Sequence, residues 1–273
     1  MQGLELPQED DTAIERLARA APDVLGSVLG AGLGLVLGGP PGALIGAATA
    51  PAMSHTLRRV GTEVSRRLLS PREESRLGAV FLLTAAETKA RLDAGEQVRQ
   101  DSFFEAGAGG RSTAEEITEG VFLAAQREYE ERKLPYLATL LTSFAFSPDI
   151  DRAHAVALLR VAQALSHRQL CLIAFYTHVV DTELPQLVTA AHPDNDALGM
   201  LISELSDLAA RGIVVSTATW DGGQAFFGPA KSDRLTRSGE HLYSLMRLDR
   251  IPSKELDAIF DAIRPAESNP STQ

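Results

Sequence analysis

The longest uncharged stretch of the chain constrains its fold more than any other feature. From Val24 to Leu57 there is no charged residue, and glycine recurs at a spacing of four through much of this stretch. The glycines of this series are Gly26, Gly30, Gly34, Gly38, Gly42 and Gly46. Residues four apart lie almost above one another on a helix, so the series predicts one bare stripe along a helical surface.

A bare glycine stripe predicts close packing against another helix or insertion into lipid. Glycine weakens a helix in water by roughly 1 kcal/mol per residue relative to alanine, so these glycines need an environment that enforces helicity. In lipid, seams of small residues four apart are a principal way of holding helices together. We therefore predict that the glycine stripe is a membrane or oligomer seam.

The length of the uncharged block leaves its path open. Its 34 residues would extend about 51 Å as one helix, against a hydrocarbon core of about 30 Å. Pro40 and Pro41 break or kink any helix that passes through them, and we expect them to form a hinge. One kinked span, two short spans and a re-entrant hairpin all fit. A soluble hairpin buried against the rest of the protein and a processed leader are the alternatives.

The charges on either side of the block favour a membrane location. Residues 1–23 are acidic, whereas residues 58–76 contain six arginines. An uncharged block followed by arginines is typical of a membrane segment with a cytoplasmic C-terminal flank. We expect Arg58, Arg59, Arg66 and Arg67 to lie beside the inner membrane, with most of the chain in the cytoplasm. A wholly cytoplasmic protein is the alternative.

Charge and cysteine content exclude two broad classes of protein. A net charge of −10 argues against a general nucleic-acid binder, which needs a basic surface to displace counterions. The single cysteine, Cys171, excludes an internal disulfide framework and indicates a reducing compartment.

The rest of the sequence predicts a mainly α protein: a helical bundle with an N-terminal glycine-rich apolar helical hairpin and a C-terminal winged helix-turn-helix. The predicted segments are an acidic arm over 1–23, the glycine-striped hairpin over 24–57, a basic flank over 58–112, a helical domain over 113–165, a winged-helix-like domain over 166–250, and a C-terminal helix with a disordered tail over 251–273. The basic flank contains an amphipathic helix over 74–96 and a glycine-rich linker over 102–112, which is the best candidate for a domain boundary. A capping box at Ser112 and Glu115 opens the helical domain.

The winged-helix prediction depends on the order of elements in 166–248. Helices predicted over 166–179, 184–192 and 194–212 precede a hairpin that turns at Asp221-Gly222-Gly223, and a last helix follows. The third helix, which would face DNA, carries Asp194, Asp196, Glu204 and Asp207. Because phosphates would repel these carboxylates, we expect a module for protein interaction or dimerisation, and no nucleic-acid partner.

One helix carries the residues that come nearest to a chemical site. His167 and Cys171 are four residues apart and can meet on one helical face, while His178 follows on the same helix. A zinc site and a Cys–His nucleophile pair both need such residues, but no CxxC or HExxH motif accompanies them. We expect Cys171 to be a core residue and the histidines to be surface groups. We therefore predict a non-enzymatic protein with no catalytic residues, metal ligands or cofactor.

Several segments resemble a known family. EYEERKLPYLATLLTSFAF followed by LSHRQLCLIAF, the run from Leu205 to Ile213, and Leu235-Thr236-Arg237-Ser238-Gly239 resemble segments of bacterial abortive-infection proteins of the Abi-alpha type. The resemblance extends over 113–248 and omits the glycine stripe. It implies a helical middle, a winged-helix-like end, and an antiviral toxin that arrests growth by disrupting the membrane. We expect this protein to have three kinds of partner: membrane lipid, further copies of the chain, and a protein or small-molecule trigger that the sequence does not identify.

Overall fold

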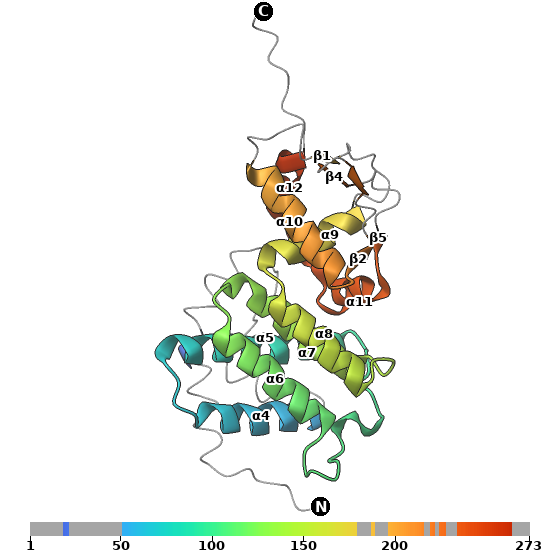
Figure 1. Ribbon diagram of the computed structural model, residues 1–273. Coiled ribbons are helices and arrows are strands. Elements are labelled where there is room, and N and C mark those ends of the chain that lie inside the picture. Colours follow the sequence, from blue (N-terminus) through green and yellow to red (C-terminus); the bar gives the residue numbers. More distant parts are fainter. Residues whose placement is uncertain are drawn as a thin grey trace, which may run out of the picture. The chain divides into compact units, whose positions relative to one another are not determined.

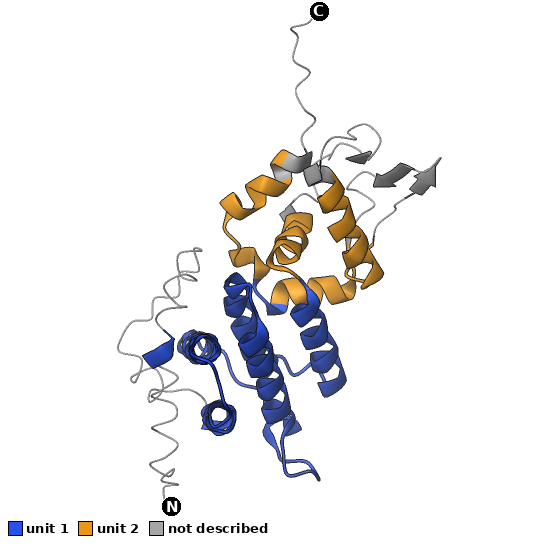
Figure 2. Cartoon of the chain, turned by 60° about the vertical axis from the view of Figure 1, so that its left-hand side comes forward, with its two compact units in different colours: residues 1–165, 245–247 blue, residues 166–244, 248–273 orange. Residues whose placement is uncertain are grey.

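The structure is a computed structural model of the 273-residue chain, and it is mainly helical. It describes residues 19–21, 51–178, 187–188, 196–215, 219–221, 224–227 and 234–263. The chain divides into two compact units, shown in Figure 2. Unit 1 comprises residues 1–165 and 245–247, and unit 2 comprises residues 166–244 and 248–273.

The described part of unit 1 is a bundle of helices (Figure 1). Its elements are α4 (Pro51–Ser65), α5 (Pro71–Asp93), η1 (Ser102–Phe104), α6 (Thr113–Arg127), η2 (Glu131–Lys133), α7 (Leu134–Phe146) and α8 (Arg152–Ala164). Helix α6 packs against α4, α5, α7 and α8, and α5 packs against α7. Residues 102–112, where the composition suggested a domain boundary, lie within unit 1 between α5 and α6.

Side-chain caps set the first residues of three of these helices. Ser70 and Glu73 form a capping box at the start of α5, and Ser112 and Glu115 form the predicted capping box at the start of α6. Asp151 accepts a hydrogen bond from a backbone amide in the first turn of α8. Each cap satisfies amides that have no partner within the helix, and so fixes where the helix begins.

Helices α5 and α7 form the centre of the bundle. Every residue of α7 from Leu134 to Phe146 is buried. The sequence predicted an amphipathic helix over 74–96, and the structure has a helix there that is buried almost continuously from Ser75 to Thr88. The amphipathic description is therefore wrong, because α5 packs against α4, α6 and α7 and retains little surface for solvent.

The side chain of Arg99 donates hydrogen bonds to backbone carbonyls at and just beyond the C-terminal end of α7. Its side chain is 4% exposed, and its guanidinium donates hydrogen bonds to the carbonyls of Phe144, Ser147 and Ile150 at 3.2, 2.9 and 2.9 Å. The same guanidinium pairs with Asp101. The last carbonyls of a helix have no intrahelical partner, and they also form the negative end of the helix dipole. A buried cation at this position donates hydrogen bonds to carbonyls at the helix end and also balances the negative end of the dipole.

A second buried cation lies just before the first turn of α7. Lys133 pairs with Glu128, and the two side chains are 2% and 8% exposed. The Lys133 ammonium also donates to the carbonyl of Gln163 at 3.3 Å. Such a pair stabilises the fold only while both partners are present, because either charge left alone would be buried without compensation.

Unit 2 combines helices with short strands. Its elements are α9 (His167–His178), β1 (Leu187–Val188), α10 (Asp196–Ala210), β2 (Val214–Val215), β3 (Thr219–Asp221), β4 (Gln224–Phe227), β5 (Arg234–Leu235), α11 (Arg237–Leu245), η4 (Leu248–Arg250) and α12 (Ser253–Ile263). One sheet has the strand order β1-β4-β3, and β2 pairs separately with β5. All of these pairings are antiparallel.

The strands of unit 2 confirm one prediction made from the sequence and show that another is wrong. Asp221 lies opposite Gln224, so β3 and β4 form the predicted hairpin. The helix predicted over 184–192 is wrong where it is described, because Leu187 and Val188 form β1 opposite residues of β4. A β-branched residue such as Val188 has a higher preference for strands than for helices, which favours this backbone pairing.

The segment Leu235-Thr236-Arg237-Ser238-Gly239 has a clear structural role in unit 2. Leu235 pairs with Val214 across β2 and β5. The Thr236 hydroxyl donates to the Gly212 carbonyl at 2.6 Å and accepts from the Gly239 amide at 3.2 Å, which caps α11. A Cβ on Gly239 would lie 2.3 Å from the carbonyl oxygen of Ile213, so this close approach requires glycine.

We predict that Arg99→Met will lower the free energy of unfolding by about 3 kcal/mol or more, because several buried carbonyls lose their donor together. Urea unfolding followed by helical circular dichroism measures this loss. The matched control is Arg132→Met, which removes an exposed arginine from the same bundle. A loss for Arg99→Met no larger than that for the control would show that Arg99 does not support α7.

Candidate functional site

The predicted glycine seam lies outside the described residues. This holds for Gly26, Gly30, Gly34, Gly38, Gly42 and Gly46, and for the predicted hinge at Pro40 and Pro41. Among the helices of the described residues, none is both long enough and apolar enough to span a membrane.

The last part of the uncharged block belongs to the folded bundle. Residues 51–57 form the first two turns of α4, and Met53, Thr56 and Leu57 are buried there, with exposed fractions of 1–3%. Helix α4 packs mainly against α6. The segment that needs a further apolar partner is therefore shortened from 24–57 to 24–50.

The arginines that follow the block have acidic partners in the bundle. Arg59 pairs with Glu115 at 2.7 Å, and Arg67 pairs with Glu119. Arg58 is half-buried and Arg66 is exposed. Farther along the chain, Arg72 and Arg76 both pair with Glu131, at 2.6 and 3.1 Å. Part of the positive charge that suggested a membrane flank is thus balanced within unit 1.

Glu119 receives two of these cationic side chains. Arg67 and Arg111 both donate to its carboxylate, which is 19% exposed. Burial raises the pKa of Glu119, but the hydrogen bonds from the two arginines outweigh this effect and hold its pKa below the ordinary value of 4.5. This carboxylate therefore links the residues after α4 to α6 while it stays ionised.

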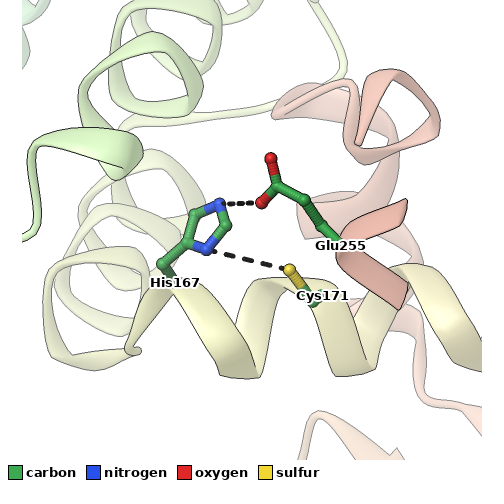
Figure 3. Close-up of side chains that lie close together, drawn as sticks. All are labelled: His167, Cys171 and Glu255. Carbon is green, nitrogen blue, oxygen red and sulfur yellow. Dashed lines mark hydrogen bonds and ion pairs between the residues drawn. The ribbon is translucent and has the colours of Figure 1, made fainter. Parts of the chain in front are cut away.

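A cluster of three chemically capable side chains lies in unit 2, and we call it the His–Cys–Glu cluster. Its members are His167, Cys171 and Glu255 (Figure 3). His167 Nδ1 lies 3.8 Å from Cys171 Sγ, and His167 Nε2 lies 3.3 Å from Glu255 Oε2. One potential ligand atom from each residue lies within 4.8 Å of the others.

Two helices position the cluster. The predicted capping box at the start of α9 is present: the Ser166 amide donates to Gln169 Oε1 at 2.9 Å, and the Gln169 amide donates to Ser166 Oγ at 3.1 Å. The box fixes the first turn of α9, which contains His167, and Cys171 follows one turn later on the same face. Helix α12 packs against α9 and contributes Glu255.

The side chains of Cys171 and His167 in this cluster are buried and do not lie on the surface. Cys171 is 3% exposed and His167 is 8% exposed. Cys171 is a core residue, as the sequence predicted, but the prediction that His167 is a surface group is wrong. The physical reason is that α12 covers the first turn of α9 and places a carboxylate against the imidazole. His178 is the last residue of α9, and its side chain lies outside the described residues.

The sequence did not indicate Glu255. It lies far from His167 along the chain, in a segment predicted only as a C-terminal helix, and no spacing rule connects the two. The arrangement places a thiol, an imidazole and a carboxylate together, which are ligand types for a borderline metal ion and also the groups of a base-activated nucleophile.

Two carboxylates of the acidic helix in unit 2, those of Glu204 and Asp207, have partners within the unit. Glu204 of α10 pairs with Arg168 of α9 at 3.0 Å. Asp207 accepts hydrogen bonds from Arg211 and Gln169, both at 2.8 Å, and these bonds lower the pKa of the Asp207 carboxyl. Two of the four carboxylates that would repel DNA therefore help to join α9 and α10.

Comparison of the chain with protein-family models, curated proteins and solved structures finds no match. What the chain does must therefore be inferred from its own residues.

We predict that Glu119→Gln will weaken the pH dependence of stability. A carboxyl whose pKa is lowered by folding contributes stability above its unfolded pKa, and that contribution is lost as the pH falls through the folded value. The free energy of unfolding of the unmodified protein should therefore fall between about pH 6 and about pH 3, and the variant should show a smaller fall.

Urea unfolding at a series of pH values measures this difference. Arg111→Gln, which removes one of the two donors to Glu119, should also reduce the fall. Equal pH dependence in the unmodified protein and in both variants would contradict the assigned role of this carboxylate.

Proposed function

We propose that this protein is a non-enzymatic, membrane-associated bacterial protein whose glycine-striped segment inserts into or assembles within the inner membrane. The helical bundle of unit 1 is the folded base that carries this segment. The observation that carries the proposal is the run of residues 24–50, which contains no charge and has glycine at every fourth position through most of its length. Such a segment requires lipid or another helix along its bare face.

The packing of α4 supports direct attachment of this segment to the base. The uncharged block continues into α4, where Met53 and Leu57 are buried. The ion pairs of Arg59, within α4, and of Arg67, just after it, join this region of the chain to α6. An anchor of this kind transmits a change in the bundle to the segment, or the reverse, through a short and well-packed helix.

Unit 2 is proposed to be a winged-helix-like module that binds a protein or small-molecule trigger. The hairpin of β3 and β4, the sheet order β1-β4-β3 and the capped helix α11 support this description. The strand β1 in place of the predicted helix departs from the usual arrangement. The net charge of −10 argues against DNA as the partner, because a nucleic-acid binder needs a basic surface to displace counterions.

The sharpest form of the proposal is an antiviral effector. In this form, a trigger recognised by the folded units releases the glycine-striped segment to form an oligomer that disrupts the membrane and arrests growth, as the resemblance to abortive-infection proteins implies. Two rival functions are a soluble regulator that acts through unit 2 and a soluble scaffold assembled through the glycine groove. Binding to DNA at low salt would support the regulator, and large soluble assemblies would support the scaffold.

We predict that Gly34→Leu will abolish self-association of the membrane segment, because a leucine side chain fills the groove and keeps backbones apart. The chain provides a matched control in Gly32→Leu, which makes the same change two residues away, on the opposite side of the predicted helix. Both variants increase apolarity equally. Chemical crosslinking in detergent and dye release from liposomes measure association and membrane disruption.

Loss of crosslinking and dye release in Gly34→Leu, with both retained in Gly32→Leu, is the expected result. The same loss in both variants, or in neither, would contradict a seam on the glycine stripe. A deletion used alongside them must end at Ala50, because removal of residues 51–57 would also remove buried side chains of α4.

A further inference from the structure

We propose that the His–Cys–Glu cluster is a binding site for a divalent metal ion of the zinc type, with His167, Cys171 and Glu255 as its three protein ligands. The proposal rests on the geometry of unit 2 and does not depend on the function proposed for the glycine stripe.

The donor set is the first argument for a metal ion. Imidazole nitrogen, thiolate sulfur and carboxylate oxygen are the three side-chain donors that zinc takes in proteins, at about 2.0–2.3 Å. Ligands at these distances around a tetrahedral ion lie roughly 3.3–3.8 Å from one another. The Cys171 Sγ to His167 Nδ1 distance of 3.8 Å falls within this range. Glu255 Oε2 lies 3.3 Å from the other ring nitrogen, Nε2, so it would join the same ion only after reorienting toward Nδ1.

The placement of the three residues is the second argument. As Figure 3 shows, Cys171 faces one nitrogen of the imidazole ring, Nδ1, and Glu255 faces the other, Nε2. All three donors lie within 4.8 Å of one another. If the ion binds through Nδ1, His167 and Cys171 keep their positions on α9. Only the Glu255 carboxylate must then move, from Nε2 toward the ion at Nδ1. The fourth position of a tetrahedral ion remains for water.

Burial and charge are the third argument. The Glu255 carboxylate is 11% exposed, and its Oε2 lies 3.3 Å from His167 Nε2. A carboxylate this deeply buried is costly unless a positive charge or a hydrogen bond compensates it. A divalent ion would balance the two negative charges of the Glu255 carboxylate and the Cys171 thiolate, with a neutral imidazole as the third ligand.

The consequence of metal binding is a fixed contact between α9 and α12. An ion held by ligands from two helices stabilises the folded state in proportion to the logarithm of its concentration over its Kd. Because the ligands come from helices that are distant in the sequence, an unfolded chain would not hold them together.

The test is titration of the full-length protein with Co²⁺ after removal of bound metal by a chelator. Co²⁺ takes zinc sites and gives a thiolate-to-cobalt charge-transfer absorption. Cys171 is the only cysteine of the chain, so any such absorption belongs to this cluster. We expect the absorption to saturate at a single equivalent of Co²⁺ and to disappear when Zn²⁺ is added in competition.

Two variants test the assigned ligands, and a third is a control. Cys171→Ser should abolish the absorption, and Glu255→Gln should keep it but weaken Co²⁺ binding by about tenfold or more. The control is His154→Gln, which changes a histidine whose side chain is 66% exposed and should bind as the unmodified protein does. Circular dichroism of each variant shows that it is folded.

Two results would overturn the proposal. The first is a folded, unmodified protein that gives no thiolate-to-cobalt absorption at any Co²⁺ concentration; alkylation of its Cys171 faster than an ordinary thiol would then assign the cluster to a reactive cysteine. The second is Glu255→Gln binding Co²⁺ as tightly as the unmodified protein, which would exclude Glu255 as a ligand.

Discussion

Complete burial of α7 is the constraint on which unit 1 depends. A helix with no exposed side needs its neighbours to cover every face and to satisfy both of its ends. Helices α5, α6 and α8 pack against it, and the guanidinium of Arg99 donates to the carbonyl of Phe144 in its last turn and to those of Ser147 and Ile150 just beyond it. The ion pair of Lys133 and Glu128 is buried beside the other end. The rest of the bundle is arranged around these requirements.

The same bundle explains how the uncharged block can be tolerated at one end of a folded protein. Its last residues enter the core through α4, and the arginines after it are matched by Glu115 and Glu119. Residues 24–50, which carry the glycine stripe, lie outside the described residues. We propose that this apolar segment is attached through α4 to the ion-paired bundle of unit 1.

Local features were predictable from the sequence, and features that depend on distant contacts were not. The capping boxes at Ser112 and Ser166 and the hairpin at β3 and β4 follow from residues only a few positions apart. The burial of α5, the strand β1 and the contact of Glu255 with His167 depend on elements far away in the chain. Hydrophobic periodicity predicts a helix, but it does not show how many neighbours will cover that helix.

Cell fractionation followed by a carbonate wash tests the central claim most directly, because carbonate releases peripheral proteins and leaves integrally inserted ones in the membrane pellet. The full-length protein should remain in the pellet, whereas a chain that lacks residues 24–50 should be released. Release of the full-length protein to the same extent as the shortened chain would contradict the account.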